Sequence, residues 1–449
     1  INMAPFVAYE WGDELYGYMK EIKKAFDPKG ILNPGVIISH DPQIHLKHFK
    51  PMPVIDEAVD QCIECGFCEI SCLTEGLTLS ARQRIVVQRE VELLSRNGEE
   101  SQKLQNLVKA FRYEGDASCA GDGLCAVTCP LSIDTGVMIK HLRARNNARR
   151  RPGNPIATWI STHFPFVHFM VRTGLGFMAG LNRLIPFRKL WIWDRHMPRP
   201  ARISALRARE PDGIMEKSKV VYFPSCINQS MGTAVRSDDK QSLVEVTLEV
   251  LGKAGYEEIF PEGISRLCCG TPWECKGFFD IADAKSAELE KALLKASEHG
   301  RFPVLCDTSP CTHRMKRVMT DQLDLYEPVE FIHDELLKRL KLKPLSGSYA
   351  FHLTCTSTKM GLEEKFEKVA RACTEHAVFP EEVGCCGFAG DKGFTQPEIN
   401  AWALRNLKVQ VDRLSGGYSN SRTCEIGLSR NSGIDYKSVM YLVRDALKE

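Results

Sequence analysis

The chain has 449 residues, 43% of them hydrophobic, which is long enough to bury a sizeable core in two to four domains. Its formal net charge is only +2, which excludes a general electrostatic attraction to nucleic acid. Its 18 cysteines fall in short-range motifs of a long chain, and this favours metal ligation in a reducing compartment over a disulfide framework.

Residues 1–53 begin with a predicted helix, "WGDELYGYMKEIKKAFDP", followed by the turn-rich "PKGILNPG". This segment could not form a domain alone. The sequence opens at Ile1 without Met and without a signal peptide. We therefore expect a longer polypeptide of which this chain is a part.

Residues 54–150 hold two groups of cysteines on either side of a helix-prone stretch, and the first group, "CIECGFCEISC", has the C-x2-C-x2-C-x3-C spacing of a 4Fe–4S site. In two-cluster proteins the fourth cysteine ligates the other cluster. We predict one cluster on Cys62, Cys65, Cys68 and Cys129, and a second on Cys72, Cys119, Asp122 and Cys125. Zinc is the alternative, although structural zinc sites usually use two separated C-x2-C pairs.

The second group, "CAGDGLCAVTCP", places Asp122 where the motif would have a thiolate, midway between Cys119 and Cys125. Three interpretations are open for this residue. Its carboxylate ligates the fourth iron, or that iron is absent and the cluster has three irons, or "GDG" is a turn in which the aspartate caps its own backbone.

Residues 151–218 form an apolar and basic connector. The stretch "PIATWISTHFPFVHFM" has no charged residue, but its 16 residues fall short of the ~20 needed to span a bilayer, and Pro165 interrupts it. Basic residues and tryptophans flank it, among them Arg183, Arg188, Lys189 and "LWIW". We predict contact with a membrane surface without crossing; the alternative is packing against a flavin domain or another partner.

From residue 219 the same pattern occurs twice, in 219–345 and 346–449: a β-rich run enters a cysteine, then come a helix, a Cys-Cys-Gly (CCG) motif, another helix and a further cysteine. We predict two pseudo-symmetric α/β CCG units with neighbouring cysteine loops. A third metal or redox centre is expected on Cys226, Cys268, Cys269, Cys306, Cys311, Cys355, Cys385, Cys386 and Cys424. We interpret Cys275 and Cys373 as buried small hydrophobes.

The predicted fold class is therefore mixed, with an α-helical ferredoxin-like domain followed by the two CCG units. No P-loop or G-x-G-x-x-G motif is present. The histidines are scattered without a nucleophile in register, so no catalytic residue is expected among His163, His168, His313 and His333.

Seven stretches carry a family resemblance: "CIECGFCE", "TLSARQRI", "CAGDGLCAVTCPLSIDTG", "CCGTPWECKG", "DTSPC", "CCGFAGDKGF" and "SNSRTCEIG". Together they resemble the C-terminal iron-sulfur portion of the FAD-dependent, quinone-linked D-lactate dehydrogenases, relatives of the glycolate oxidase iron-sulfur subunit. The stretch "AFDPKGILNPGVI" looks like the end of the FAD-linked oxidase domain that precedes this portion in such fusions. That family often has the C-x2-D-G-x-C form, which favours a functional Asp122.

The resemblance implies that a D-2-hydroxy acid is oxidised on an FAD held by an N-terminal oxidase domain. Electrons would leave through two iron-sulfur clusters to quinone or another acceptor. The expected location is cytoplasmic, peripheral on the inner face of the cell membrane. Alternatives are an iron-sulfur subunit of a glycolate oxidase, a glycerol-3-phosphate dehydrogenase or a heterodisulfide reductase-type complex, and a zinc scaffold without redox function. This chain alone is not expected to oxidise lactate, because it has no complete flavin site.

Overall fold

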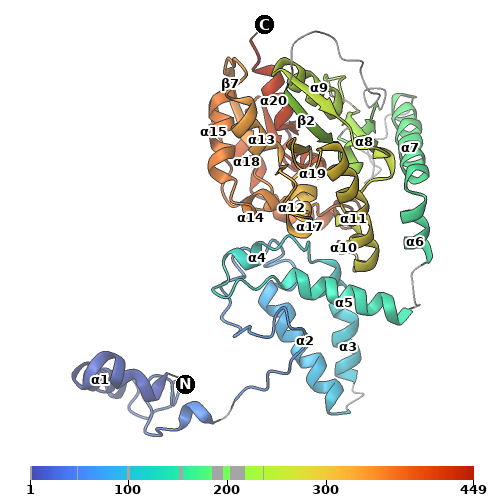
Figure 1. Cartoon of the computed structure of the whole chain (residues 1–449). Helices are drawn as coiled ribbons and strands as arrows, with labels where there is room; N and C mark the ends of the chain where they lie inside the picture. The colour runs from blue at the N-terminus through green and yellow to red at the C-terminus, as the bar shows by residue number, and fades with distance from the viewer. Residues whose placement is uncertain are drawn as a thin grey trace.

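The computed structural model describes residues 3–47, 49–98, 102–150, 155–184, 196–202, 218–235 and 237–448. Its N-terminal segment contains η1 (Ala4–Phe6), α1 (Val7–Phe26) and η2 (Ile44–Leu46). Helix α1 covers most of the predicted first helix. In Figure 1 this segment lies apart from the body of the molecule.

The first cysteine-rich region is helical. Its elements are α2 (Ala81–Arg96), α3 (Gln102–Phe111), the π-helical η3 (Arg112–Ala117), α4 (Leu124–Val127) and α5 (Thr135–Arg150). Helix α2 begins at a capping box, in which Ser80 accepts from the Gln83 amide while the Gln83 side chain accepts from the Ser80 amide. Buried side chains such as Ile85, Phe111 and Ile139 hold these helices together.

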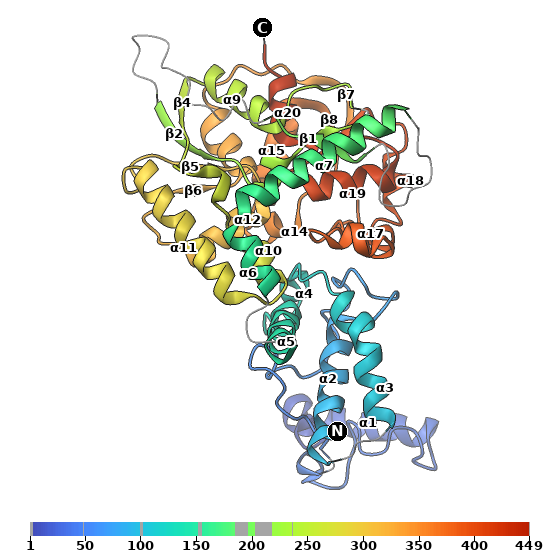
Figure 2. The same ribbon diagram turned by 90° about the vertical axis from the view of Figure 1, so that its right-hand side faces the viewer.

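The connector folds into α6 (Pro155–Thr162), α7 (Phe164–Leu184) and β1 (Pro198–Pro200). Helix α7 lies along β1 and α8 on the surface of the CCG units, as Figure 2 shows. It is long and apolar enough to cross a membrane by length and composition alone. The length argument from the 16-residue stretch was therefore wrong, because α7 continues past Arg172. The flanking Arg188, Lys189 and "LWIW" lie outside the described residues.

The first CCG unit is a four-stranded parallel sheet with the order β4-β2-β5-β6. Its elements are β2 (Ser218–Phe223), α8 (Cys226–Ser230), β3 (Met231–Ala234), α9 (Leu243–Lys253), β4 (Tyr256–Ile259), η5 (Ile264–Arg266), α10 (Thr271–Cys275), α11 (Phe279–Ala296), β5 (Val304–Cys306), α12 (Ser309–Val318), β6 (Leu325–Tyr326), α13 (Pro328–Phe331) and the π-helical η6 (Ile332–Leu336). Strand β3 instead pairs with β1 as an antiparallel ribbon.

The second CCG unit repeats this arrangement as β8-β7-β9-β10, again all parallel. Its elements are β7 (Leu345–Phe351), α14 (Cys355–Lys359), α15 (Glu363–Cys373), β8 (Thr374–Val378), α16 (Lys392–Thr395), α17 (Pro397–Ala403), α18 (Leu407–Val411), β9 (Gly416–Ser419), α19 (Arg422–Ser432), β10 (Tyr436–Ser438) and α20 (Val439–Asp445). If the four strands of each sheet are numbered along the chain, both sheets have the order second, first, third, fourth. The prediction of two repeated α/β units is confirmed.

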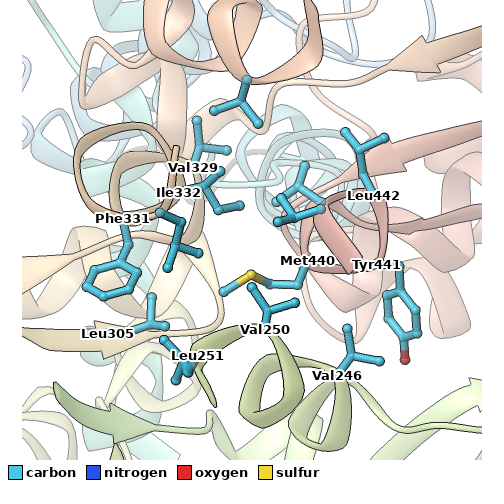
Figure 3. Packing of buried hydrophobic residues seen from close by; sticks show 14 of the residues in the cluster. Val246, Val250, Leu251, Leu305, Val329, Phe331, Ile332, Met440, Tyr441 and Leu442 are labelled. Atoms are coloured by element: carbon cyan, nitrogen blue, oxygen red, sulfur yellow. The ribbon is translucent and has the colours of Figure 1, made fainter. Parts of the chain in front are cut away.

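The two units share one hydrophobic core. Figure 3 shows Val250, Leu251 and Phe331 of the first unit beside Met440 and Leu442 of the second, and all are buried. Because neither unit encloses these side chains alone, we expect the pair to unfold as one cooperative body.

Replacing the fully buried Phe331 with alanine should lower the free energy of unfolding of the CCG pair by about 3–5 kcal/mol, since it removes a ring and leaves a cavity. Urea denaturation at matched metal content measures the change. Val409→Ala is the control, because Val409 is 81% exposed and its variant should stay within about 0.5 kcal/mol of the parent. Separate unfolding transitions for the two units would contradict the shared core.

Candidate functional site

One cavity brings together the four cysteines of the first predicted set. Cys62, Cys65, Cys68 and Cys129 line it, together with apolar side chains that include Ile85. Burial raises the pKa of the Cys68 thiol to about 11, and Cys62 and Cys129 add to the rise. Metal binding would have to drive the loss of this proton.

A buried arginine positions the cysteine loop of this cavity. Arg89 on α2 is 3% exposed and donates to the Cys62 carbonyl at 3.0 Å and to Glu64 Oε1 at 2.8 Å. Glu64 has φ +60°, a conformation that L-residues rarely adopt. The Arg89 contacts offset this strain, and the Glu64 amide in turn donates to Cys62 Sγ at 3.4 Å.

A second cavity brings together the other predicted set, namely Cys72, Cys119, Asp122 and Cys125. Thr135 lines both cavities, so the two sites are neighbours. Burial raises the pKa values of Cys119 and Cys125. The crossing of Cys72 and Cys129 between the loops is the arrangement expected of a two-cluster protein, although ligation itself remains a prediction. In the described ranges no three His, Cys, Asp or Glu side chains form a site for a single metal ion.

Arg84 on α2 is the main electrostatic feature of the second cavity. It is 1% exposed, and its Nη1 donates to Cys72 Sγ at 3.5 Å. Its other acceptors in the described chain are the Gly115 carbonyl and the hydroxyls of Thr74 and Ser118, none of which carries a full charge. A buried cation needs a nearby anion. A thiolate-ligated cluster would supply it, so these residues fit an iron-sulfur cluster.

The two oxygens of Asp122 have different environments. Oδ1 accepts from the Leu124 amide at 3.2 Å, which is the capped turn that the "GDG" composition favours. Oδ2 is buried and has no hydrogen-bond partner among the described residues, so it is available to a metal. Burial raises the pKa of Asp122, while the nearby Cys385 thiol lowers it in part. Asp122 can therefore cap the turn through Oδ1 and still ligate iron through Oδ2, and this ligation remains a prediction.

Five of the nine CCG cysteines gather in the first unit. In parallel strands β2 and β5, Phe223 pairs with Cys306, so the cysteines after these strands meet at one edge of the sheet. A hydrogen bond from Cys268 lowers the pKa of Cys226, and hydrogen bonds from Cys268 and Cys311 lower that of Cys269. The group thus contains good thiolate candidates.

The other four cysteines, Cys355, Cys385, Cys386 and Cys424, gather in the second unit, where the sulfurs of Cys386 and Cys424 are 3.0 Å apart. We name the two sets the first and second thiol groups, because each forms at the strand ends of its own sheet. The third metal or redox centre expected on these cysteines stays a prediction. The loops do adjoin, as predicted: Ser309 of the first unit bonds Thr356 of the second at 2.8 Å.

Charged contacts dock the helical region on the CCG pair. Lys140 on α5 donates to Glu274 of α10 at 2.7 Å, and both are nearly buried. Arg143 donates to the Cys275 carbonyl at 2.6 Å, and Tyr113 donates to Glu398 at 2.6 Å. These contacts hold the second cavity beside the second thiol group.

Three side chains without a predicted ligand role lie in different environments. Cys373 is fully buried as predicted, whereas Cys275 is only half-buried because it ends α10 at the surface facing α5. His168, interpreted as an ordinary packed or surface histidine, adjoins Cys226 and helps to lower its pKa. No local spacing could have shown this contact. Arg84 lies within the stretch "TLSARQRI", but only the fold shows what it touches.

Comparison with known proteins agrees with this architecture. Residues 1–37 match the family of FAD linked oxidases, C-terminal domain, and residues 220–316 and 349–414 match the cysteine-rich CCG domain. Lactate utilization protein A of Oceanobacillus iheyensis is 24% identical over 217 residues, which is 44% of this chain and 83% of that protein. One subunit of the anaerobic glycerol-3-phosphate dehydrogenase of Escherichia coli K12 is 24% identical over 197 residues, which is 40% of this chain and 49% of that protein.

The chain thus combines a stretch that matches the end of an FAD-linked oxidase domain with two stretches that match CCG domains. It is distantly homologous to lactate utilization protein A and to this glycerol-3-phosphate dehydrogenase subunit, and it spans about half the length of the latter. The coarse part of the sequence resemblance is confirmed.

Replacing Arg84 with methionine should lower the reduction potential of the cluster that Cys72 helps to hold. A charge-assisted hydrogen bond contributes about 1.5 kcal/mol, which is about 60 mV for a one-electron couple. EPR-monitored redox titration measures this shift. Arg96→Met is the control, since Arg96 lies on the same helix but is exposed. Unchanged potentials in the Arg84 variant would contradict the role of this cation.

Replacing Asp122 with cysteine should complete a four-thiolate set. If the native corner lacks iron, the three-iron EPR signal of the oxidised protein should disappear and the iron content should rise by about one per chain. If Asp122 ligates, the iron content should stay the same while air sensitivity falls, because a thiolate holds iron more firmly than a carboxylate. Asp321→Cys, in an exposed loop, controls for the added thiol. If the variant matches the parent in iron content, reduction potential and air sensitivity, Asp122 has no ligand role and only caps its turn.

Proposed function

We propose that this chain is the electron-transfer part of an FAD-dependent D-2-hydroxy-acid dehydrogenase, with D-lactate as substrate and quinone as acceptor. The observation that carries the proposal is the pair of crossed four-residue sets, each around its own cavity, in a chain whose residues 1–37 match FAD linked oxidases. When bound, iron-sulfur clusters accept and release single electrons. The residues of this chain position them and set their potentials.

The order of the sites supports a direction for electron flow. The first cavity faces solvent: Cys65 is exposed, and the exposed apolar residues Ile63 and Leu131 line it. A flavin domain could dock on this rim. The second cavity adjoins the CCG pair through Asp122 and Cys385. We infer that electrons enter at the first set and leave through the second toward the thiol groups, which are a candidate redox centre.

The N-terminal segment suits packing against the rest of an FAD-linked oxidase domain. Trp11, Ile22 and Phe26 of α1 are 58%, 60% and 84% exposed. Aromatic and aliphatic side chains in such number are usually covered by a partner. Together with the family match of residues 1–37, this favours the flavin-linked function over a subunit of the glycerol-3-phosphate dehydrogenase or heterodisulfide reductase type.

We also propose that α6 and α7 rest on the inner face of the cell membrane. Trp159, Phe166, Phe169 and Phe177 are each 48–70% exposed, while the opposite face of α7 packs on the first CCG unit through Leu175. Amphipathic aromatic surfaces of this kind lie in the bilayer interface. A quinone in the membrane would then be close to His168 and Cys226, which α7 covers.

The function is tested with the complete flavin-containing enzyme, prepared anaerobically. D-Lactate should bleach the absorbance near 400 nm with no dithionite added, whereas L-lactate and glycerol 3-phosphate should not. Cys68→Ser should remove the first cluster and Cys72→Ser the second, because the fourth cysteine crosses over. A Cys72 variant that loses only the cluster held by Cys62 would refute the crossed pairing, and bleaching by glycerol 3-phosphate instead of D-lactate would refute the substrate.

The membrane contact is tested by liposome flotation of the complete enzyme. The variant with Trp159, Phe166, Phe169 and Phe177 changed to serine should stay off anionic liposomes and lose reduction of a long-tailed quinone, yet keep reduction of a water-soluble dye. Phe164 is left unchanged because it is only 7% exposed and packs in the core beside Cys268. Val318 and Val409, changed to serine, form the control. Equal flotation of both variants would exclude the contact.

A further inference from the structure

A cavity lies where the two CCG units meet, outside both cluster sites. It is lined by α8 and β3 of the first unit and by α19, β10 and α20 of the second, and it is partly open to solvent. Three buried polar side chains of its lining matter here: Asn228, Arg422 and Glu425. None of them belongs to a predicted ligand set.

Arg422 has only part of its guanidinium engaged. The residue is 8% exposed, and its Nη1 donates to Glu425 Oε2 at 2.8 Å. Its Nε and Nη2 have no hydrogen-bond partner among the described residues. These two nitrogens form the side edge of the guanidinium, whose parallel N–H groups match the two oxygens of a carboxylate. Leaving both buried without an acceptor costs free energy, which a bound carboxylate would remove.

Two acceptors of the lining also lack a donor. Glu425 Oε1 and Asn228 Oδ1 are buried and unpartnered in the part of the chain that the structure describes. Asn228 cannot simply turn its amide, because Nδ2 donates to Thr308 Oγ1 at 3.0 Å and to the Asp307 carbonyl at 3.4 Å. A ligand hydroxyl could donate to either acceptor.

We propose that this cavity binds a small hydroxy-carboxylate, with its carboxylate on the Nε–Nη2 edge of Arg422 and its hydroxyl donating to Glu425 or Asn228. Sulfate fits less well, since it carries no proton near neutral pH and would bring only acceptors toward these two oxygens.

The site goes beyond the proposed function, because it lies on the CCG pair and not in the flavin part. Asn228 follows Cys226 by two residues on α8, and Arg422 precedes Cys424 by two on α19. A ligand here would thus contact the first turn of one cysteine-bearing helix from each unit. Hydroxy acids are also the proposed substrate class, so occupancy of this site, and with it the environment of the thiol groups, would depend on the substrate concentration.

The experiment is calorimetric titration of the 449-residue chain, of which residues 1–37 match an FAD-linked oxidase domain. D-Lactate should give saturable binding, acetate should bind at least tenfold more weakly because it has no hydroxyl, and glycerol and sulfate should not bind measurably. Arg422→Lys keeps the charge but removes the parallel N–H edge, so it should weaken the binding of D-lactate by about tenfold or more. Arg371→Lys, an exposed arginine far from the cavity, is the matched control.

A second variant covers the case in which Arg422→Lys does not fold by circular dichroism. Glu425→Gln is nearly isosteric, can still accept from Arg422, and should reduce the preference for D-lactate over acetate. The proposal is overturned by no saturable D-lactate binding to the parent chain, by equal binding of D-lactate and sulfate, or by unchanged binding in a folded variant. Because the titration measures binding and not turnover, these outcomes are independent of whether the complete enzyme oxidises D-lactate.

Discussion

The structure depends on the crossing of two cysteines between neighbouring cavities. A C-x2-C-x2-C loop is too short to supply a fourth ligand to its own cluster. Cys72 therefore lines the cavity of Cys119 and Cys125, and Cys129 lines that of the first loop. Each crossing ties the loop before α2 to the loop before α5. The crossing accords with the shared wall at Thr135, which lines both cavities.

Electrostatics add a second level of organisation. Arg84 and Arg89 extend from α2 toward different cavities, so one helix supplies the buried cation of each site. Lys140 of α5 then pairs with Glu274 across the interface with the CCG pair. Oriented cations near thiolates stabilise the negative charge that an iron-sulfur cluster carries. The same helices thus shape the sites, set their electrostatic field and dock them on the thiol groups.

The spacing of residues along the sequence predicted those features of the structure that depend on neighbouring residues. The cysteine motifs, the repeated α/β units and the neighbouring CCG loops could all be read from the sequence, because ligand loops and strand–helix periodicity are short-range features. Contacts between distant segments could not be read in the same way: Asp122 beside Cys385, His168 beside Cys226, and the separation of the nine thiols into two groups depend on tertiary packing. The uncharged stretch "PIATWISTHFPFVHFM" likewise did not show that Phe164 is buried while Phe166 is exposed.

Whether the two crossed sets hold iron-sulfur clusters is the central question, and metal analysis tests it most directly. Iron, zinc and acid-labile sulfide should be measured per chain on anaerobically purified protein. We expect at least about seven irons, an equal or nearly equal amount of sulfide, and only traces of zinc. About one or two zinc ions per chain with no sulfide would contradict the cluster sites and would identify the cysteine sets as structural zinc sites.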